Sequence, residues 1–134
     1  MAENAEIVRR AFDAFLRRDL AALLALVDPD MVFMPATARM AGRGTEPYRG
    51  HEGIRTYLAD VARVWQELRP EPDEFIEVDD VVVCTGRIYA WGIGRVIDAP
   101  AGWFWRLRDG RLIEGRVFDT RREALAAGGL DLRR

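Results

Sequence analysis

Apolar residues recur at helical spacing in three stretches of the chain. In residues 4–18 they form one side, opposite a mostly charged side, which predicts a first amphipathic helix. Asp19 can cap a second, short helix over residues 20–27, and Asp28-Pro29 would stop it because the residue before a proline avoids the helical region. The clearest apolar stripe lies in residues 52–68 and predicts a third helix.

Strand-like patterns dominate the second half of the chain. The predicted strands are 31–35, 75–78, 81–91 and the two arms of a hairpin over 102–120. Thr120 to Glu123 is a capping box, which predicts a last short helix over residues 121–127. Helices followed by antiparallel strands form an α+β order, in which three helices pack on one side of a curved, mostly antiparallel sheet. Such a sheet, covered by a long helix, forms a cone with an internal cavity.

Two segments lack any periodicity and are predicted as loops. Residues 36–50 hold four glycines or prolines, and a loop of this length in a compact domain usually has a function, so we expect a lid. Residues 92–102 are also punctuated by glycine and proline and predict a crossover into the hairpin.

The hairpin is the centre of the predicted fold. If Asp109 and Gly110 are its two turn residues, Trp105 faces Glu114 and Trp103 faces Arg116 across the two strands. One face then carries Trp103, Trp105, Leu107, Leu112, Glu114, Arg116 and Phe118, which is the pattern of a cavity wall with one carboxylate and one guanidinium. A turn one residue longer would exchange the faces of one strand relative to the other.

Glu114 and Arg116 are the main candidates for chemistry. They are two residues apart on one strand, so about 7 Å separates their Cα atoms. A carboxylate desolvated beside Trp105 could act as a general base, with Arg116 holding an anionic or carbonyl oxygen. The alternative is a structural ion pair with a cation-π contact between Arg116 and Trp103.

Other polar residues have a structural and a functional interpretation. Asp98 is either a turn residue or a group at the mouth of the cone, and His51 either packs at a helix entry or serves as an acid or base. Asp119 fits the transition from strand to helix. Arg87 and Tyr89 share one face of a strand, and the sequence does not decide whether that face meets the cavity.

Composition excludes several kinds of site. The 134 residues fit one domain and include neither serine nor lysine, which excludes a serine nucleophile, a Schiff-base lysine and a P-loop lysine. One histidine and one cysteine cannot supply the usual zinc ligands, and no fingerprint for a cofactor is present. The net charge of -2 gives no argument for nucleic acid or a membrane surface as a partner. A lone cysteine and an acidic beginning without a leader pattern lead us to expect a cytoplasmic protein.

Three stretches of the chain resemble the SnoaL-like members of the nuclear transport factor two superfamily, which includes ketosteroid isomerases and limonene epoxide hydrolases. They are DLAALLALVDPDMVF at 19–33, YRGHEGIRTYL at 48–58 and WRLRDGRLIEGRVFDTRREAL at 105–125. The resemblance implies a cone-shaped α+β barrel with a hydrophobic pocket, often in a homodimer formed through the outer face of the sheet.

The catalytic residues of these relatives do not carry over. Met34 stands where the isomerases place an aspartate base, and Phe12 and Trp103 stand near the positions of their oxyanion donors. The cyclases and epoxide hydrolases use an aspartate at the position that Arg116 holds here. This chain therefore lacks the catalytic residues that the known enzymes of this fold use.

Two functions stay open on this basis. One is a pocket for a small apolar or aromatic molecule, serving a cofactor-independent isomerase, cyclase or hydrolase with Glu114 and Arg116 as catalytic residues. The expected lining of that pocket is Phe12, Met34, Trp103, Trp105 and Phe118. The alternative is a non-catalytic module for ligand binding or dimerisation.

Overall fold

The computed structural model describes residues 3–35 and 46–130 and shows one six-stranded sheet with four helices. The sheet order is β2-β1-β6-β5-β4-β3, with β1 and β6 parallel and all other neighbours antiparallel. The strands are β1 Val27–Met34, β2 Tyr48–Arg49, β3 Glu67–Val78, β4 Val81–Gly92, β5 Arg95–Arg108 and β6 Arg111–Phe118. The helices are α1 Glu3–Leu16, α2 Leu20–Ala25, α3 Gly50–Val64 and α4 Arg121–Ala127.

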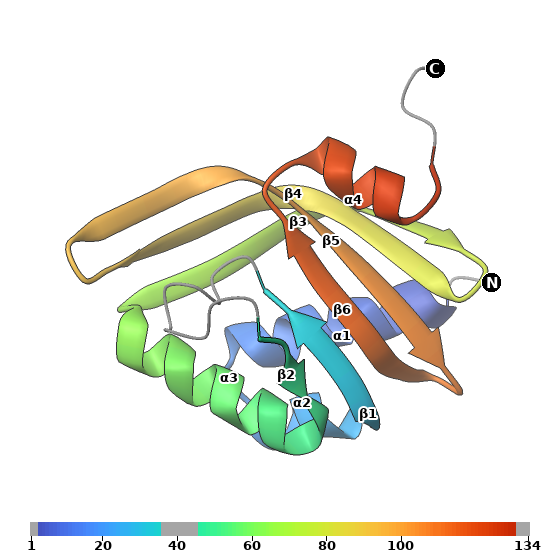
Figure 1. The fold of residues 1–134 in the computed structure, drawn as a ribbon, viewed down its shortest axis with the longest axis horizontal. Helices are drawn as coiled ribbons and strands as arrows, with labels where there is room; N and C mark the ends of the chain where they lie inside the picture. Colours follow the sequence, from blue (N-terminus) through green and yellow to red (C-terminus); the bar gives the residue numbers. More distant parts are fainter. Residues whose placement is uncertain (1–2, 36–45, 131–134) are drawn as a thin grey trace.

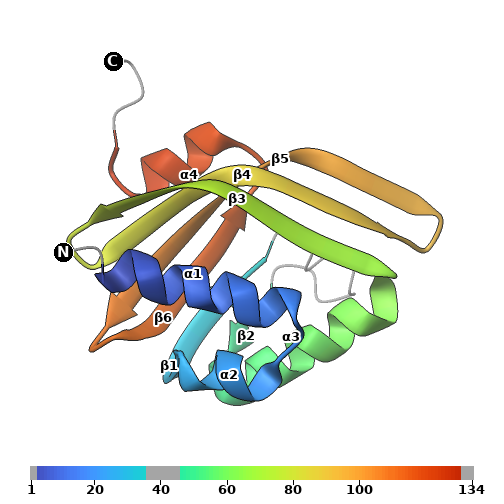
Figure 2. The same cartoon turned by 180° about the vertical axis from the view of Figure 1, so that it is seen from behind.

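The sheet curves around the first three helices, and the fourth lies on its other face. Figures 1 and 2 show α1, α2 and α3 on the concave side and α4 on the convex side. This arrangement confirms the predicted α+β class, with three helices against a curved, mostly antiparallel sheet and a short C-terminal helix. No helix among the described residues is long and apolar enough to span a membrane.

Both predicted helix caps are present. The Asp19 carboxylate accepts a hydrogen bond of 3.1 Å from the Ala22 amide at the start of α2. The Thr120 hydroxyl accepts one of 3.1 Å from the Glu123 amide at the start of α4. These bonds satisfy amide groups that have no partner within the helix.

The third helix is shorter than predicted, and the strand after it is much longer. The helix α3 ends at Val64, where residues 65–68 were expected to continue it, and β3 runs from Glu67 instead of from residue 75. Pro70 and Pro72 lie within this strand. They are tolerated because β3 is the edge of the sheet, where a missing amide donor leaves no neighbour unpaired.

The predicted crossover at residues 92–102 is wrong, because β4 and β5 form a tight hairpin. Ile93 and Gly94 form its turn with φ of 45° and 75°, and Arg95 already pairs with Gly92. The predicted turn at Asp109-Gly110 is confirmed, with φ of 52° and 76°. Both turns use the left-handed backbone that favours two-residue hairpins. The hairpin of β4 and β5 extends beyond the helices in Figure 1.

The predicted register of the second hairpin is wrong beyond its first pairs. Leu107 pairs with Leu112, but Arg106 pairs with Glu114, so Ile113 is an extra residue in a β-bulge. Beyond the bulge the faces of β6 are exchanged: Trp105 lies opposite Gly115, and Phe104 lies opposite Arg116.

The exchange has a steric reason at Gly115. A Cβ atom there would lie 2.5 Å from the indole of Trp105 and 2.9 Å from the ring of Phe33. Those two rings stack against each other at 5.8 Å between centroids and 8° between planes. Only glycine fits beneath the stack, so the bulge places Gly115 there and turns Glu114 outward.

The core has a main part inside the cone, a second part where the end of α3 meets β3 and β4, and a third part beneath α4. In the main part, side chains of α1, α2, α3 and β1 pack on Trp103 and Trp105. In the part beneath α4, Ala124 and Leu125 of α4 pack on Val83 and Phe104. The predicted lid at 36–50 falls mostly on residues 36–45, which lie outside the described residues; Tyr48–Arg49 forms β2 and Gly50 begins α3.

Candidate functional site

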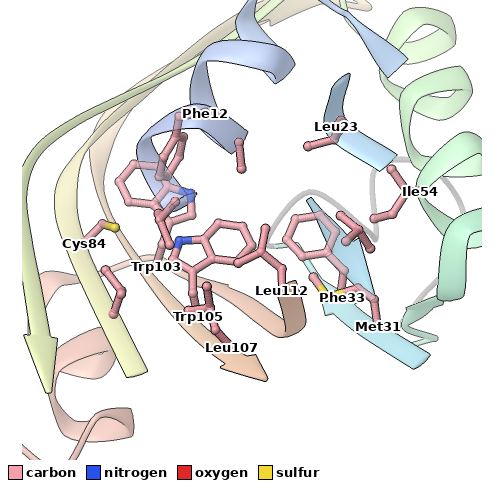
Figure 3. Close-up of a cluster of buried hydrophobic side chains, with 14 of the residues drawn as sticks. Phe12, Leu23, Met31, Phe33, Ile54, Cys84, Trp103, Trp105, Leu107 and Leu112 are labelled. Atoms are coloured by element: carbon pink, nitrogen blue, oxygen red, sulfur yellow. The ribbon is translucent and has the colours of Figure 1, made fainter. Parts of the chain in front are cut away.

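An apolar cavity of about 80 Å³ lies between the concave face of the sheet and the helices. Its lining is Ala11, Phe12, Phe15, Leu23, Val27, Met31, Phe33, Pro35, Ile54, Tyr57, Leu68, Pro70, Ile88, Trp103, Trp105, Leu112 and Val117. Figure 3 shows part of this wall, with Phe33 beside the indole of Trp105 and Cys84 on the far side from Ile54. Side chains from all layers of the cone therefore converge on one space.

Aromatic contacts hold the wall in place. Phe12 of α1 meets Trp103 edge to face at 5.2 Å and 84°, and Trp105 at 5.8 Å and 89°. Tyr57 of α3 meets Phe33 at 5.0 Å and stacks on Phe15 at 5.8 Å and 21°. Such pairs fix ring orientations beyond what apolar burial alone requires. The cavity thus has walls of interlocked rings.

Three of the five predicted lining residues border the cavity, and two do not. Phe12, Trp103 and Trp105 lie in its wall. Met34 does not, because alternation along β1 brings Met31 and Phe33 to the cavity and turns Met34 away. Phe118 packs in the core part beneath α4, because the bulge at Ile113 exchanges the face of its strand.

Glu114 and Arg116 lie together on the convex face, outside the cavity. Glu114 Oε2 is 3.1 Å from Arg116 Nε, and Glu114 Oε1 is 3.4 Å from Arg106 Nε. Arg116 also lies 5.1 Å above the ring of Phe104, instead of the predicted Trp103. The two candidates form an ion pair, but they do not share a face with Trp103 and Trp105 as predicted. Their placement on the cavity wall is wrong.

The remaining polar candidates lie in structural settings. Asp98 pairs with Arg87 at 2.8 Å on the convex face, where Tyr89 also lies beneath Arg69. The opposite face of β4 carries Ile88 into the cavity wall, which settles the side that the sequence left open. His51 Nε2 is 2.7 Å from the carbonyl oxygen of Val27, which joins the start of α3 to β1.

Asp119 lies between the end of β6 and Thr120, the N-cap residue of α4, as predicted for the transition from strand to helix.

Few polar groups accompany the apolar wall. Among the described residues, Trp105 Nε1 is buried without a hydrogen-bond partner of good geometry. The Cys84 thiol lies close enough for a weak interaction with this indole, and burial raises the pKa of that thiol well above its ordinary value. Within residues 3–35 and 46–130, no three His, Cys, Asp or Glu side chains gather as a metal site would require.

Sequence reasoning missed part of the wall. Leu68 and Pro70 line the cavity from β3, which begins at Glu67 and not at residue 75 as predicted. The predicted helix over residues 52–68 covered the position of Leu68 instead. Tyr57 and Ile54 were part of the predicted apolar stripe of the third helix. That stripe indicated that they face inward, but it was interpreted only as core packing and not as cavity lining.

Solved structures with the same fold cover most of this chain. A protein of unknown function from Burkholderia pseudomallei, described as nuclear transport factor two-like, is 28% identical with a TM-score of 0.79, covering 94% of this chain and 97% of its own. TerC, co-crystallised with polyporic acid, is 27% identical with a TM-score of 0.77, covering 96% and 97%. A Catenulispora acidiphila protein with a ketosteroid isomerase-like fold, in complex with trimethylamine, is 17% identical with a TM-score of 0.73, covering 94% of each chain.

Among curated proteins, none matches this chain significantly. The family model of the SnoaL-like domain matches residues 8–115. That range holds most of α1, all of α2 and α3, the first five strands and the part of β6 that reaches the cavity at Leu112, and it ends before α4. The sequence match and the shared fold agree, and the chain belongs to the SnoaL-like domain family.

Proposed function

We propose that this protein binds a small apolar or aromatic molecule in the cavity. The observation that carries the proposal is the lining itself, which consists of aliphatic and aromatic side chains from the helices and the sheet. Apolar concave sites with few polar groups are the usual places for small ligands. The rings of Trp103 and Trp105 offer faces and edges on which an aromatic ligand can pack.

A related protein supports a small-molecule ligand. TerC, 27% identical to this chain, was crystallised with polyporic acid. The two chains cover nearly all of each other. We infer binding of the same general kind here, of a compact ring-containing molecule, without assigning that compound to this protein.

The proposal is for binding rather than turnover. Among the described residues of the wall, Tyr57 is the side chain that carries a hydroxyl group able to exchange a proton. Glu114 and Arg116 face away from the cavity and neutralise each other. This arrangement favours the non-catalytic alternative over an isomerase, cyclase or hydrolase that uses Glu114 as its base.

A matched pair of substitutions tests the proposal. Leu23 lines the cavity, whereas Leu16 is 45% exposed on the surface of α1. A phenylalanine at position 23 would fill the cavity, whereas one at position 16 would not. The experiment is a panel of one-ring and two-ring aromatic and terpenoid compounds, read by thermal melting and by saturable quenching of tryptophan fluorescence.

The expected result is a compound that raises the melting temperature of the wild type, because a ligand of the native state stabilises it. Leu23→Phe should weaken its binding at least tenfold, and Leu16→Phe should leave it unchanged. Equal affinities in Leu23→Phe and the wild type would place the ligand elsewhere and contradict the proposal.

A further inference from the structure

Arg18 occupies an unusual position where α1 ends. Its φ is 54°, in the left-handed region that favours glycine at the end of a helix. Its Nη1 donates to the Phe15 carbonyl at 2.5 Å and its Nη2 to the Leu68 carbonyl at 2.7 Å. The guanidinium carbon lies 4.1 Å from the centre of the Phe15 ring. An arginine in a strained conformation therefore holds its guanidinium against α1 and β3.

The guanidinium has no carboxylate partner among the described residues within 4.0 Å. Its neighbour Arg17, by contrast, pairs with Asp13 and Asp19, each at 3.1 Å. A guanidinium has five N–H donors, and those of Arg18 that do not meet Phe15 and Leu68 remain for another acceptor. Partial burial lowers the pKa of Arg18, which indicates that the charge is partly removed from water.

Arg18 lines a second, more polar hollow and touches two residues of the apolar cavity wall. The ring beneath its guanidinium, Phe15, and the residue whose carbonyl it binds, Leu68, both line the cavity. On the other side, Arg18 lines a groove of about 380 Å³ with Arg63, residues 64–66 at the end of α3, and Ile93 of the hairpin turn. The guanidinium is thus one ring away from the apolar cavity, with open space beside it.

A cation beside an apolar cavity favours apolar molecules that carry an anionic group over neutral ones. An anionic oxygen can accept two parallel hydrogen bonds from a guanidinium, and the partly desolvated setting strengthens such bonds. Glu67 acts on the Arg18 charge and opposes an anion, and Asp60 lies beside Arg63 of the groove. Glu67 is paired with Arg69, and Asp60 is paired with Arg63. Their charges are therefore largely neutralised.

We propose that Arg18 is a specificity-determining residue that selects apolar molecules carrying a carboxylate. The apolar part of the ligand lies in the cavity against Phe15 and Leu68, and its carboxylate accepts hydrogen bonds from the Arg18 guanidinium in the groove. This inference rests on the proposed function of the cavity and adds the chemical class of the ligand.

The test compares two probes that differ only in charge, 1-naphthylacetic acid and the neutral 1-naphthylacetamide, by isothermal titration calorimetry at neutral pH. The wild type should bind the acid about tenfold more tightly than the amide. Arg18→Gln should bind both probes equally, with an affinity for the amide within twofold of the wild type. Arg17→Gln, which removes the adjacent exposed charge, should keep the tenfold preference.

Arg18→Gly provides a second variant that does not depend on tolerance of glutamine at this backbone position. Glycine adopts a φ of 54° without strain, so the fold is expected to persist while the guanidinium is lost. It should abolish the preference as Arg18→Gln does.

The outcomes separate this inference from the proposed function. Binding of the amide with no preference for the acid in the wild type would overturn the role of Arg18 and leave the cavity proposal standing. A preference that survives in both Arg18 variants would also overturn it. Binding of neither probe would count against the cavity proposal and the inference together.

Discussion

Gly115 shows how one residue decides what the cavity contains. It lies beneath the stacked rings of Trp105 and Phe33, and an added Cβ atom would lie within 3.0 Å of both. That closeness keeps the indole of Trp105 flat against Phe33 and the cavity wall in its present shape. The β-bulge at Ile113 brings this glycine beneath the two rings and turns Glu114 outward.

Gly115→Ala should therefore destabilise the protein. We expect a loss of about 1–3 kcal/mol, because overpacking displaces large side chains from their rotamers. The free energy of unfolding, measured by urea denaturation, provides the check. Gly94→Ala is the control, since no atom lies within 4 Å of a Cβ there and only the strain of a φ of 75° is added. An unchanged unfolding midpoint for Gly115→Ala would contradict the packing described for Trp105.

Cys84 gives the protein a pH-dependent term in its stability. Burial raises the pKa of the folded thiol well above the unfolded value of about 8.5, so the native state holds a proton that the unfolded state releases. The contribution is fully present below pH 8.5 and declines as the pH rises above it, by about 1.4 kcal/mol for each pH unit. Urea denaturation from pH 8 to 10 should show this decline, and Cys84→Ala should show a smaller one.

The same burial should make the thiol unreactive in the folded protein. A thiol reagent at pH 8 is expected to modify Cys84 only after denaturant is added, because the reactive thiolate is scarce and enclosed. Rapid modification without denaturant would contradict both the burial and the pH dependence.

At the level of elements, α4 depends on its capping box. The helix has seven residues and covers Val83 and Phe104 with Ala124 and Leu125. Thr120→Ala removes the acceptor for the Glu123 amide and should lower the free energy of unfolding by about 1 kcal/mol. Thr120→Ser retains the hydroxyl and should lose less than half of that. Equal losses in the two variants would show that the hydroxyl bond is not the stabilising contact.

Elements with local signals were predictable, and elements set by their neighbours were not. The caps at Asp19 and Thr120 and the Asp109-Gly110 turn depend on residues within four positions of one another. The strand β3 does not, because Pro70 and Pro72 are acceptable only at the edge of a sheet whose order the sequence does not reveal.

The placement of Glu114 and Arg116 on the cavity wall was wrong for a reason of the same kind. Asp109-Gly110 correctly predicts the turn, but the bulge at Ile113 arises three residues later from contacts between Gly115, Trp105 and Phe33. Phe33 is more than seventy positions away in sequence, so no local pattern marks the bulge. The prediction that Phe12, Trp103 and Trp105 line the cavity was correct, because none of them lies on β6 beyond the bulge at Ile113.

For the whole molecule, the order of elements sufficed to predict the curved α+β sheet and its covering helices. Two of the three sequence stretches that resemble SnoaL-like proteins lie within the range matched by the family model, and the third, at 105–125, overlaps its end. Fold and family can thus be predicted from features that are spread along the whole chain. A single error in strand register does not remove those features. The identity of a ligand depends on a few side chains and does not follow in this way.

The predicted homodimer requires an exposed apolar face that a second copy of the chain can cover. The convex face near the end of the hairpin exposes Trp91 at 44% and Val96 at 71%, on paired positions of β4 and β5. A second copy that covers this face would bury both. Light scattering should then give twice the chain mass of 15.2 kDa, and Val96→Asp should shift the protein toward the monomer. A monomer for the wild type at every concentration tested would contradict the prediction.

If the cavity holds a small apolar molecule, the signals of the tryptophans that line it should respond, and the chain has four tryptophans in all. Trp103 and Trp105 line the cavity, whereas Trp91 is exposed on the hairpin. The measurement is the position of the four indole N–H signals in a ¹⁵N-labelled sample during titration with 1-naphthylacetamide. Saturable shifts of the Trp103 and Trp105 signals are expected, while the Trp91 signal stays in place. Shifts confined to Trp91, or none at saturating probe, would contradict binding in the cavity.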